Sequence, residues 1–241
     1  MLDGDLDGAN AEYDEASRLL AELGSHEDLS EVQLRLAEIA ARRGDLAKAR
    51  ELSAAARALA ESGGTPIDRG IAAAWWADFE VTWGDIDAAR PLHVVAERHL
   101  ARFGPTHPVR EHLEAIVAAT SARIAIADED LPRAREQASR SYLAAAGTQD
   151  MPLLALASGT AAELAFALGR PELAAELLGA SAAVRGYADP TDAAAVKLVP
   201  RLRAALGADR YARCHARGQA LGRAEAIERL DPAGLDPARL G

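Results

Sequence analysis

The stretch Gly44-Asp45-Leu46-Ala47-Lys48-Ala49 lies between two apolar helical patterns and decides the fold. Related hexapeptides begin at Gly4, Gly84, Glu129 and Gly169, so successive copies start 40, 40, 45 and 40 residues apart. In such a hexapeptide, Gly ends one helix in a left-handed conformation and Asp caps the next. The aliphatic side chain then staples the turn, and the small Ala lets two helices approach closely. A repeat of this kind predicts stacked helix pairs.

Apolar residues recur with helical spacing on both sides of the corner, from Leu29 to Ala40 before it and from Leu46 to Leu59 after it. Each unit is therefore a helix A, a tight corner and a helix B. Hydrophobic residues make up 49% of the chain and aromatic residues only 4%, a balance that favours close-packed helices over sheets. We expect an all-α fold.

The predicted organisation is one repeat domain with a cap. Residues 1–190 form about four and a half helix pairs, residues 191–230 form capping helices of the same domain, and residues 231–241 form a tail punctuated by Pro and Gly. The first corner, at Gly4, has a helix B but no helix A before it. Because a solenoid normally ends in a polar cap, we expect either a fragment of a longer chain or another surface covering this edge.

Charge and composition narrow the class of protein. The net charge of −10 opposes sequence-independent binding to nucleic acid. The last fifty residues are locally basic, but a solvated helix face explains their arginines most simply. One cysteine, Cys214, excludes an internal disulfide, and the first fifteen residues are acidic, unlike a secretory signal. No apolar run approaches the roughly 20 residues of a membrane span, so we expect a cytoplasmic protein without membrane contact.

The Gly-Asp corner with Ala five residues after Gly resembles the tetratricopeptide repeat. The unit of that family is shorter than the 40-residue spacing here, so the resemblance implies longer helices. The Trp and Tyr positions of its helix A mostly carry Leu and Ala in this chain. On this resemblance, the expected architecture is a right-handed helical-repeat solenoid of tetratricopeptide-like helix pairs.

The segment from about Ala161 to Leu230 carries a second signature. It contains Gly169 to Ala180, reading GRPELAAELLGA, then Leu202 to Gly207 with Tyr211, and Gly218 to Leu221. It resembles the carboxy terminus of large multidomain transcriptional regulators of actinobacteria, the antibiotic-regulatory and LuxR-type proteins that join DNA-binding, ATPase and tetratricopeptide modules. The resemblance implies a regulatory arm that senses a signal or holds the regulator inactive. This chain has no phosphate-binding loop ending in Gly-Lys-Ser or Gly-Lys-Thr, and no basic recognition helix is evident in it.

An aromatic stripe holds all three tryptophans. Trp76, Phe79 and Trp83 lie at i, i+3 and i+7 on a helix A, beside Trp75. Such a stripe either grips an apolar ligand or peptide or fills the core between repeats, and the core is the commoner use. Adjacent residues point about 100° apart, so Trp75 or Trp76 should be more exposed. The predicted binding residues are Trp75, Trp76, Phe79, Trp83, Arg69, Arg98 and Arg110.

Metal binding and catalysis receive little support. His93, His99, His107 and His112 are spaced by 6, 8 and 5 residues, which does not stack two ligands one helical turn apart. Neighbouring Cys214 and His215 face different directions on a helix, and no nucleophile elbow or zinc-protease motif occurs. We therefore predict no enzyme activity, no metal and no cofactor.

Three functions stay open. The first is a regulatory domain that binds a protein segment, including other domains of the same regulator, or senses a signal. The second is a receptor for a small molecule or peptide, which should have a closed, partly polar pocket around Trp76 where a scaffold has an open groove. The third is a homodimerisation scaffold that pairs through its amino-terminal edge, from Gly4 to Leu23.

Overall fold

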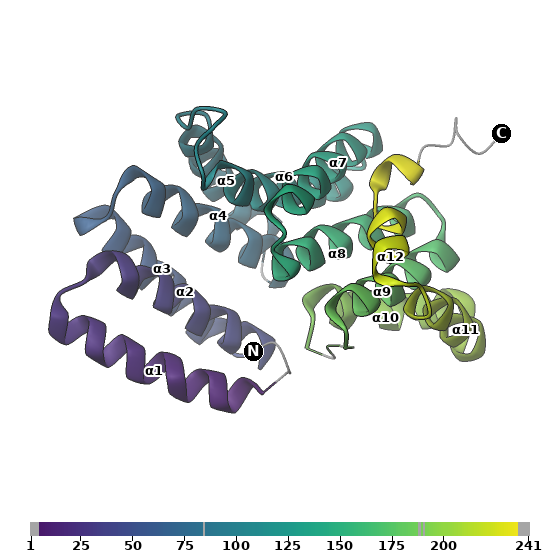
Figure 1. Cartoon of the computed structure of the whole chain (residues 1–241), viewed down its shortest axis with the longest axis horizontal. Helices are drawn as coiled ribbons and strands as arrows, with labels where there is room; N and C mark the ends of the chain where they lie inside the picture. Colours follow the sequence, from purple (N-terminus) through teal and green to yellow (C-terminus); the bar gives the residue numbers. More distant parts are fainter. Residues whose placement is uncertain (1–4, 84, 188, 190, 236–241) are drawn as a thin grey trace. The chain divides into compact units, whose positions relative to one another are not determined.

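The computed structural model describes residues 5–83, 85–187, 189 and 191–235, and within these residues it contains twelve α-helices and no strand (Figure 1). The helices pack in consecutive pairs, which confirms the all-α prediction. Their bounds are α1 Leu6–Leu23, α2 His26–Arg42, α3 Leu46–Gly63, α4 Pro66–Trp83, α5 Ile86–Leu100, α6 Arg110–Ala127, α7 Leu131–Thr148, α8 Met151–Ala167, α9 Pro171–Arg185, α10 Ala193–Leu206, α11 Ala208–Gln219 and α12 Arg223–Arg229.

The repeated hexapeptide forms the corners before α1, α3, α5, α7 and α9. The Asp45 carboxylate accepts a hydrogen bond from the Lys48 amide at 3.0 Å, and the equivalent aspartates before α1, α5 and α7 also cap their helices. Gly44 and Gly169 have the predicted positive φ, at 83° and 73°. Gly4 and Gly84 lie outside the described residues. Glu129 takes the left-handed position at its own corner, with φ of 59°.

The corner alanines are the most uniform feature of the repeat. Each one is the fifth residue after its Gly or Glu, and each is buried. A larger side chain at this point would push the following helix away from its neighbours. These residues are Ala9, Ala49, Ala89, Ala134 and Ala174.

The chain divides into two compact units, residues 1–113 and 114–241. In the first unit, α1 packs on α2, α2 packs on both α3 and α4, and α4 packs on α5. Phe79 is buried there with Ala40, Ala41 and Ala49. Of the eighteen residues of α1, only Ala9 is buried.

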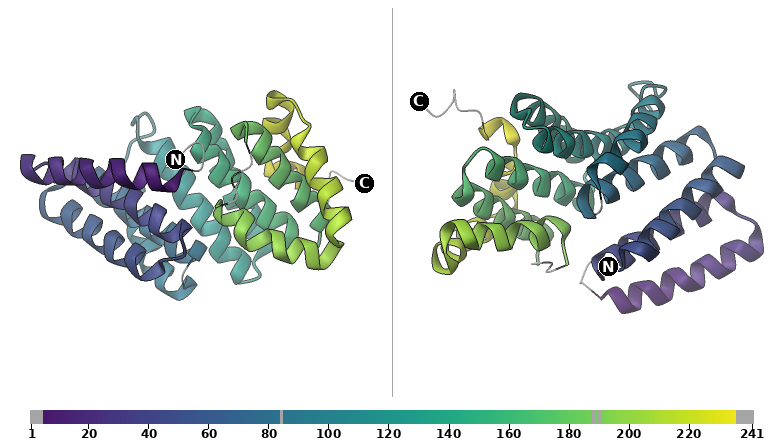
Figure 2. Two further views of the ribbon diagram at one scale, coloured as in Figure 1. Left: turned by 90° about the horizontal axis from the view of Figure 1, so that it is seen from below. Right: turned by 180° about the vertical axis from the view of Figure 1, so that it is seen from behind.

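In the second unit, α9 is surrounded by its neighbours (Figure 1, Figure 2). It packs against α8, α10, α11 and α12, and nine of its fifteen residues are buried. The contact with α11 is very close, because a Cβ atom placed on Gly179 would lie 2.0 Å from the His215 carbonyl oxygen. A Cβ atom placed on Gly218 would lie 1.9 Å from the Glu176 carbonyl oxygen. Only glycine fits at these two positions.

The end of the described chain differs from the predicted tail. Residues Pro232–Leu235 form a short 3₁₀ helix, η1, in which Pro232 and Leu235 are buried. The Tyr142 hydroxyl donates a hydrogen bond to the Ile227 carbonyl at 2.8 Å, and Arg170 donates one to the Leu235 carbonyl at 3.3 Å. The four residues of η1 therefore belong to the fold, because two of them are buried, the segment packs on α7, and the Arg170 side chain holds the Leu235 carbonyl. The rest of the predicted tail, residues 236–241, lies outside the described residues.

Within the described part of the chain, no helix is both long enough and apolar enough to cross a membrane.

Candidate functional site

The aromatic stripe lies on α4, where the sequence predicts it. Phe79 is 8% exposed and forms part of the core of the first unit. Trp76 and Trp83 are half-buried and pack against the same core. The core interpretation of the stripe therefore describes these three residues well.

Trp75 and Trp76 each have an arginine over the indole ring. The Arg35 guanidinium carbon lies 5.2 Å from the Trp75 ring centroid, and that of Arg57 lies 5.9 Å from the Trp76 ring centroid. Such cation–π contacts contribute about 0.5–1 kcal/mol at exposed sites. Because Arg35 comes from α2 and Arg57 from α3, the two indoles meet different helices.

The buried carboxylate of Glu80 lies one helical turn after Trp76 on α4. Glu80 accepts hydrogen bonds from Arg50 at 2.9 and 3.0 Å, from the Trp76 indole at 3.3 Å and from the Asp85 amide at 3.4 Å. Burial raises the pKa of Glu80, but the hydrogen bonds from Arg50 and Trp76 and the charge of Arg50 outweigh burial and hold the pKa below its ordinary value. The carboxylate is thus ionised and locked between α3 and α4.

The predicted arginines do not gather at the tryptophans. Arg69 donates hydrogen bonds to the carbonyls of Ala60 and Gly64, and Arg110 donates to those of Leu100 and Phe103. Both arginines therefore bind backbone carbonyls at and just after the ends of α3 and α5. Arg98 is exposed on α5.

Sequence reasoning missed the arginines that do reach the tryptophans and Glu80. These are Arg35, Arg50 and Arg57. Two of them, Arg50 and Arg57, are seven residues apart on α3, so they share one helix face. That spacing was the available signal.

A charged position recurs on the first helix of each helix pair, and we call this set the charged register. Counting six residues back from the start of each corner hexapeptide gives Glu38 on α2, Asp78 on α4, Arg123 on α6 and Glu163 on α8. Asp78 is 8% exposed and Arg123 is 6% exposed. Aligning the repeats would have revealed this register, because the four positions share one offset from the corner.

In the second unit, this register forms an ion pair between α6 and α8. Arg123 Nε lies 3.1 Å from Glu163 Oε2. Next to it, Lys197 has a pKa lowered by burial and by the charge of Arg123, while Glu163 acts in the opposite direction. Between α8 and α10, the Arg201 guanidinium carbon lies 4.5 Å from the Phe166 ring centroid. Charged and aromatic side chains therefore lie between α6, α8 and α10, whereas apolar contacts alone would suffice to pack these helices.

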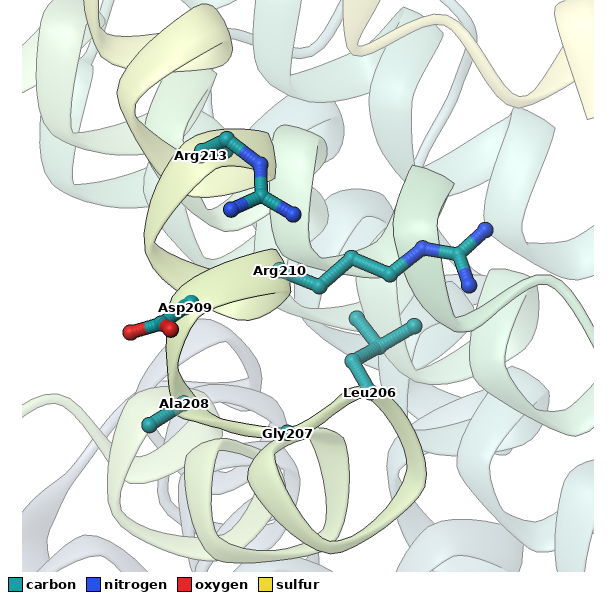
Figure 3. A pocket seen from close by; sticks show the side chains of 6 residues that line it. All are labelled: Leu206, Gly207, Ala208, Asp209, Arg210 and Arg213. Carbon is teal, nitrogen blue, oxygen red and sulfur yellow. The ribbon is translucent and has the colours of Figure 1, made fainter.

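A small open hollow lies at the corner between α10 and α11 (Figure 3). Leu206, Gly207, Ala208 and Asp209 line it together with Arg210 and Arg213. The two arginine side chains project from the same side of α11, and Asp209 projects from the other side (Figure 3). Arg210 forms an ion pair with Glu172 of α9. Arg213 therefore carries the positive charge of the hollow that this ion pair does not offset.

The histidines noted in the sequence have separate surroundings. His107 stacks on Phe103 with ring centroids 4.8 Å apart, and His93 Nε2 lies 3.3 Å from Glu97 Oε1. Among the described residues, no group of three or more His, Cys, Asp or Glu side chains is arranged to hold a metal ion.

Comparison of the chain with protein-family models, with curated proteins and with solved structures found no match. The following proposals are therefore based on the geometry and on the sequence signatures.

Proposed function

We propose that the chain is a regulatory domain that binds a protein segment or senses a signal, and that it does no catalysis. Its helix pairs form a right-handed solenoid of the tetratricopeptide kind, and the partner lies on the surface of the inner helices within a unit, α2 with α4 or α6 with α8. The domain works in the cytoplasm as part of an actinobacterial transcriptional regulator, whose other domains are among its candidate partners. It contacts neither nucleic acid nor membrane directly.

The charged register of the inner helices is the observation on which the proposal depends. Removing a charge from water is unfavourable unless the charge is paired, and replacing a buried ion pair by apolar residues is often neutral or stabilising. The corner alanines show that packing alone selects small apolar residues in every repeat. A charge at one offset in four repeats, buried at Asp78 and Arg123 and half-buried at Glu38 and Glu163, is therefore better explained by recognition than by stability.

The carboxy-terminal signature supports the regulator assignment. Gly179 comes from the segment Leu177-Leu178-Gly179-Ala180, and Gly218 begins the segment Gly218-Gln219-Ala220-Leu221. Both glycines lie at the close contact between α9 and α11. The two halves of the signature thus have one physical reason to occur together, which favours a shared fold with the regulators that they resemble.

The receptor hypothesis has less support around Trp76. Its indole N–H is bonded to Glu80, and its ring packs on the core of the first unit beneath Arg57. A ligand there would have to displace these contacts. An interaction surface along the inner helices needs no such rearrangement.

Site-specific photo-cross-linking tests the proposal. A photoreactive residue replaces Glu38 or Glu163 on the inner helices, and as matched controls Glu51 on α3 or Glu136 on α7, both exposed. We expect the inner positions to cross-link one protein segment in the native host, and Glu163→Lys to weaken its binding to the purified chain at least about tenfold. Equal cross-linking from the control positions, or unchanged affinity of the variant, would contradict the proposal.

A further inference from the structure

Helix α1 exposes an acidic stripe on the side that α2 leaves uncovered. With its capping residue, α1 holds six carboxylates and one cation, Arg18, a net charge of −5. Glu12, Glu15, Leu19 and Leu23 lie at i, i+3, i+7 and i+11, so they follow one face of the helix. Leu19 is 44% exposed and Leu23 is 79% exposed. The stripe thus combines negative charge with uncovered apolar surface.

The end of the second unit carries the opposite charge. Helices α10 and α11 contain six cations and one carboxylate, Asp209, a net charge of +5. Three of the arginines, Arg210, Arg213 and Arg217, repeat the i, i+3, i+7 spacing of Glu12, Glu15 and Leu19. The six cations are Lys197, Arg201, Arg203, Arg210, Arg213 and Arg217.

The α11 face also presents small apolar side chains that the leucines of α1 can contact. Ala212 and Ala216 are exposed on it beside Arg213. Within the described residues, Arg213 has no carboxylate within ion-pair distance. Small apolar side chains next to an unmatched guanidinium suit a stripe that presents both leucine and carboxylate.

The charge of the α1 stripe favours a basic surface as its partner. Two α1 stripes placed together would repel each other, which opposes symmetric pairing through this edge. An α1 stripe placed on α10 and α11 brings opposite charges together. The exposed ion pairs present in one chain, such as Arg18 with Glu15, contribute little and can exchange for pairs between chains.

We propose that the acidic stripe of α1 docks on the α10–α11 face of a second copy of the chain. The contact is head-to-tail, so each copy keeps one free stripe and one free basic face, and the assembly grows with concentration. The interface uses neither Glu38 nor Glu163. Lys197 of α10 lies near Glu163, so the variants that test the contact are placed on α1 and α11, and either proposal can fail alone.

Sedimentation velocity of the full chain over a concentration series tests the proposal, at ~20 mM and at ~500 mM salt. One variant reverses the stripe, Glu12→Arg with Leu19→Arg, and another reverses the basic face, Arg213→Glu with Ala216→Glu. The control, Glu136→Arg with Leu143→Arg, changes one acid and one exposed leucine with the same spacing on α7. All six positions are exposed, so we expect folded variants with unchanged circular dichroism.

We expect the wild type and the control to grow in mass with concentration at low salt and to be monomeric at high salt. Each reversed variant alone should associate at least about tenfold more weakly, and mixing the two should restore association, because each supplies the face that the other lacks. A wild type that is monomeric throughout would overturn the proposal. So would a dimer that survives reversal of the basic face, since such a dimer pairs through α1 alone.

Discussion

Helices α1 and α9 follow the same corner motif and have very different surroundings. Each begins at a copy of the hexapeptide, and each buries the alanine of that copy, Ala9 or Ala174. Beyond this point they diverge, since Ala9 is the single buried residue of α1 whereas α9 buries nine of its fifteen residues. The motif therefore sets where a helix begins, and the number of neighbouring helices sets how much of that helix is buried.

The largest effect is expected where α9 meets α11. Gly179→Ala places a methyl group against the His215 carbonyl, and backbone cannot yield as a flexible side chain does. The higher helix propensity of Ala recovers at most about 1 kcal/mol. We expect a net loss of at least about 2 kcal/mol in the free energy of unfolding, measured by urea denaturation and circular dichroism.

Two companion variants define this effect. Gly218→Ala should destabilise by a similar amount, because it meets the Glu176 carbonyl from the other helix. Gly222→Ala is the control, since Gly222 has a negative φ and a Cβ atom placed on it would lie 4.0 Å from an oxygen of the flexible Glu225 side chain. If Gly179→Ala and Gly222→Ala unfolded at the same urea concentration, this result would contradict the close contact between α9 and α11.

An intermediate loss in the free energy of unfolding is expected at Glu80, because this side chain is both buried and charged. Glu80→Gln removes the ionised acceptor of Arg50 and should destabilise the chain by about 1–3 kcal/mol at pH 7, since hydrogen bonds to charged groups contribute roughly this much. Glu51→Gln is the matched control on α3. Its exposed pair with Lys48 should contribute less than about 1 kcal/mol.

The difference in stability between wild type and Glu80→Gln should depend on pH, and the pKa of Glu80 sets its sign. The folded chain holds the Glu80 pKa below the ordinary value of 4.5, so its stabilising contribution is present above that value. The contribution falls as the pH drops below 4.5 through the folded pKa, where Glu80 becomes protonated. Urea midpoints of wild type and Glu80→Gln should therefore converge in acid, and a gap that widened there would contradict the lowered pKa.

The sequence predicted the parts of the fold that depend on local chemistry. The corners, the helix starts and the buried alanines follow from capping, backbone conformation and side-chain size within six residues. Helical spacing predicted that Trp76 and Phe79 share one face of a helix, and it left open whether this face fills the core or binds a ligand. The repeated stacking as a right-handed solenoid stays a prediction.

The candidate site was harder to predict because it depends on distant contacts. Glu80 becomes a buried ion-pair partner only when Arg50 arrives from α3, thirty residues earlier. Arg69 and Arg110, chosen for their nearness in sequence, instead bind backbone carbonyls near the ends of α3 and α5. Side-chain partners across helices cannot be assigned from periodicity alone, although aligned repeats indicate which positions share a face.

A smaller effect is expected at the fourth corner, where the comparison of corner motifs can be sharpened. Glu129 adopts φ of 59°, a conformation that disfavours residues with a Cβ atom. Glu129→Gly should stabilise the second unit by up to about 1 kcal/mol, and Gly169→Ala should destabilise it by a similar amount, since Gly169 has φ of 73°. Thermal melts of the two variants measure both signs, and two shifts in the same direction would contradict the shared corner geometry.

The smallest effect is expected at the exposed edge of α1. Leu23 is 79% exposed, so Leu23→Ser removes almost no buried area and should change the free energy of unfolding by less than about 0.5 kcal/mol. Leu177→Ala in α9 is the contrasting variant, because Leu177 is 1% exposed and its truncation should cost about 2–5 kcal/mol. Both are measured at high salt, where association between copies is suppressed. A large loss for Leu23→Ser under these conditions would mean that α1 is covered within a single chain, and the contrast between α1 and α9 would disappear.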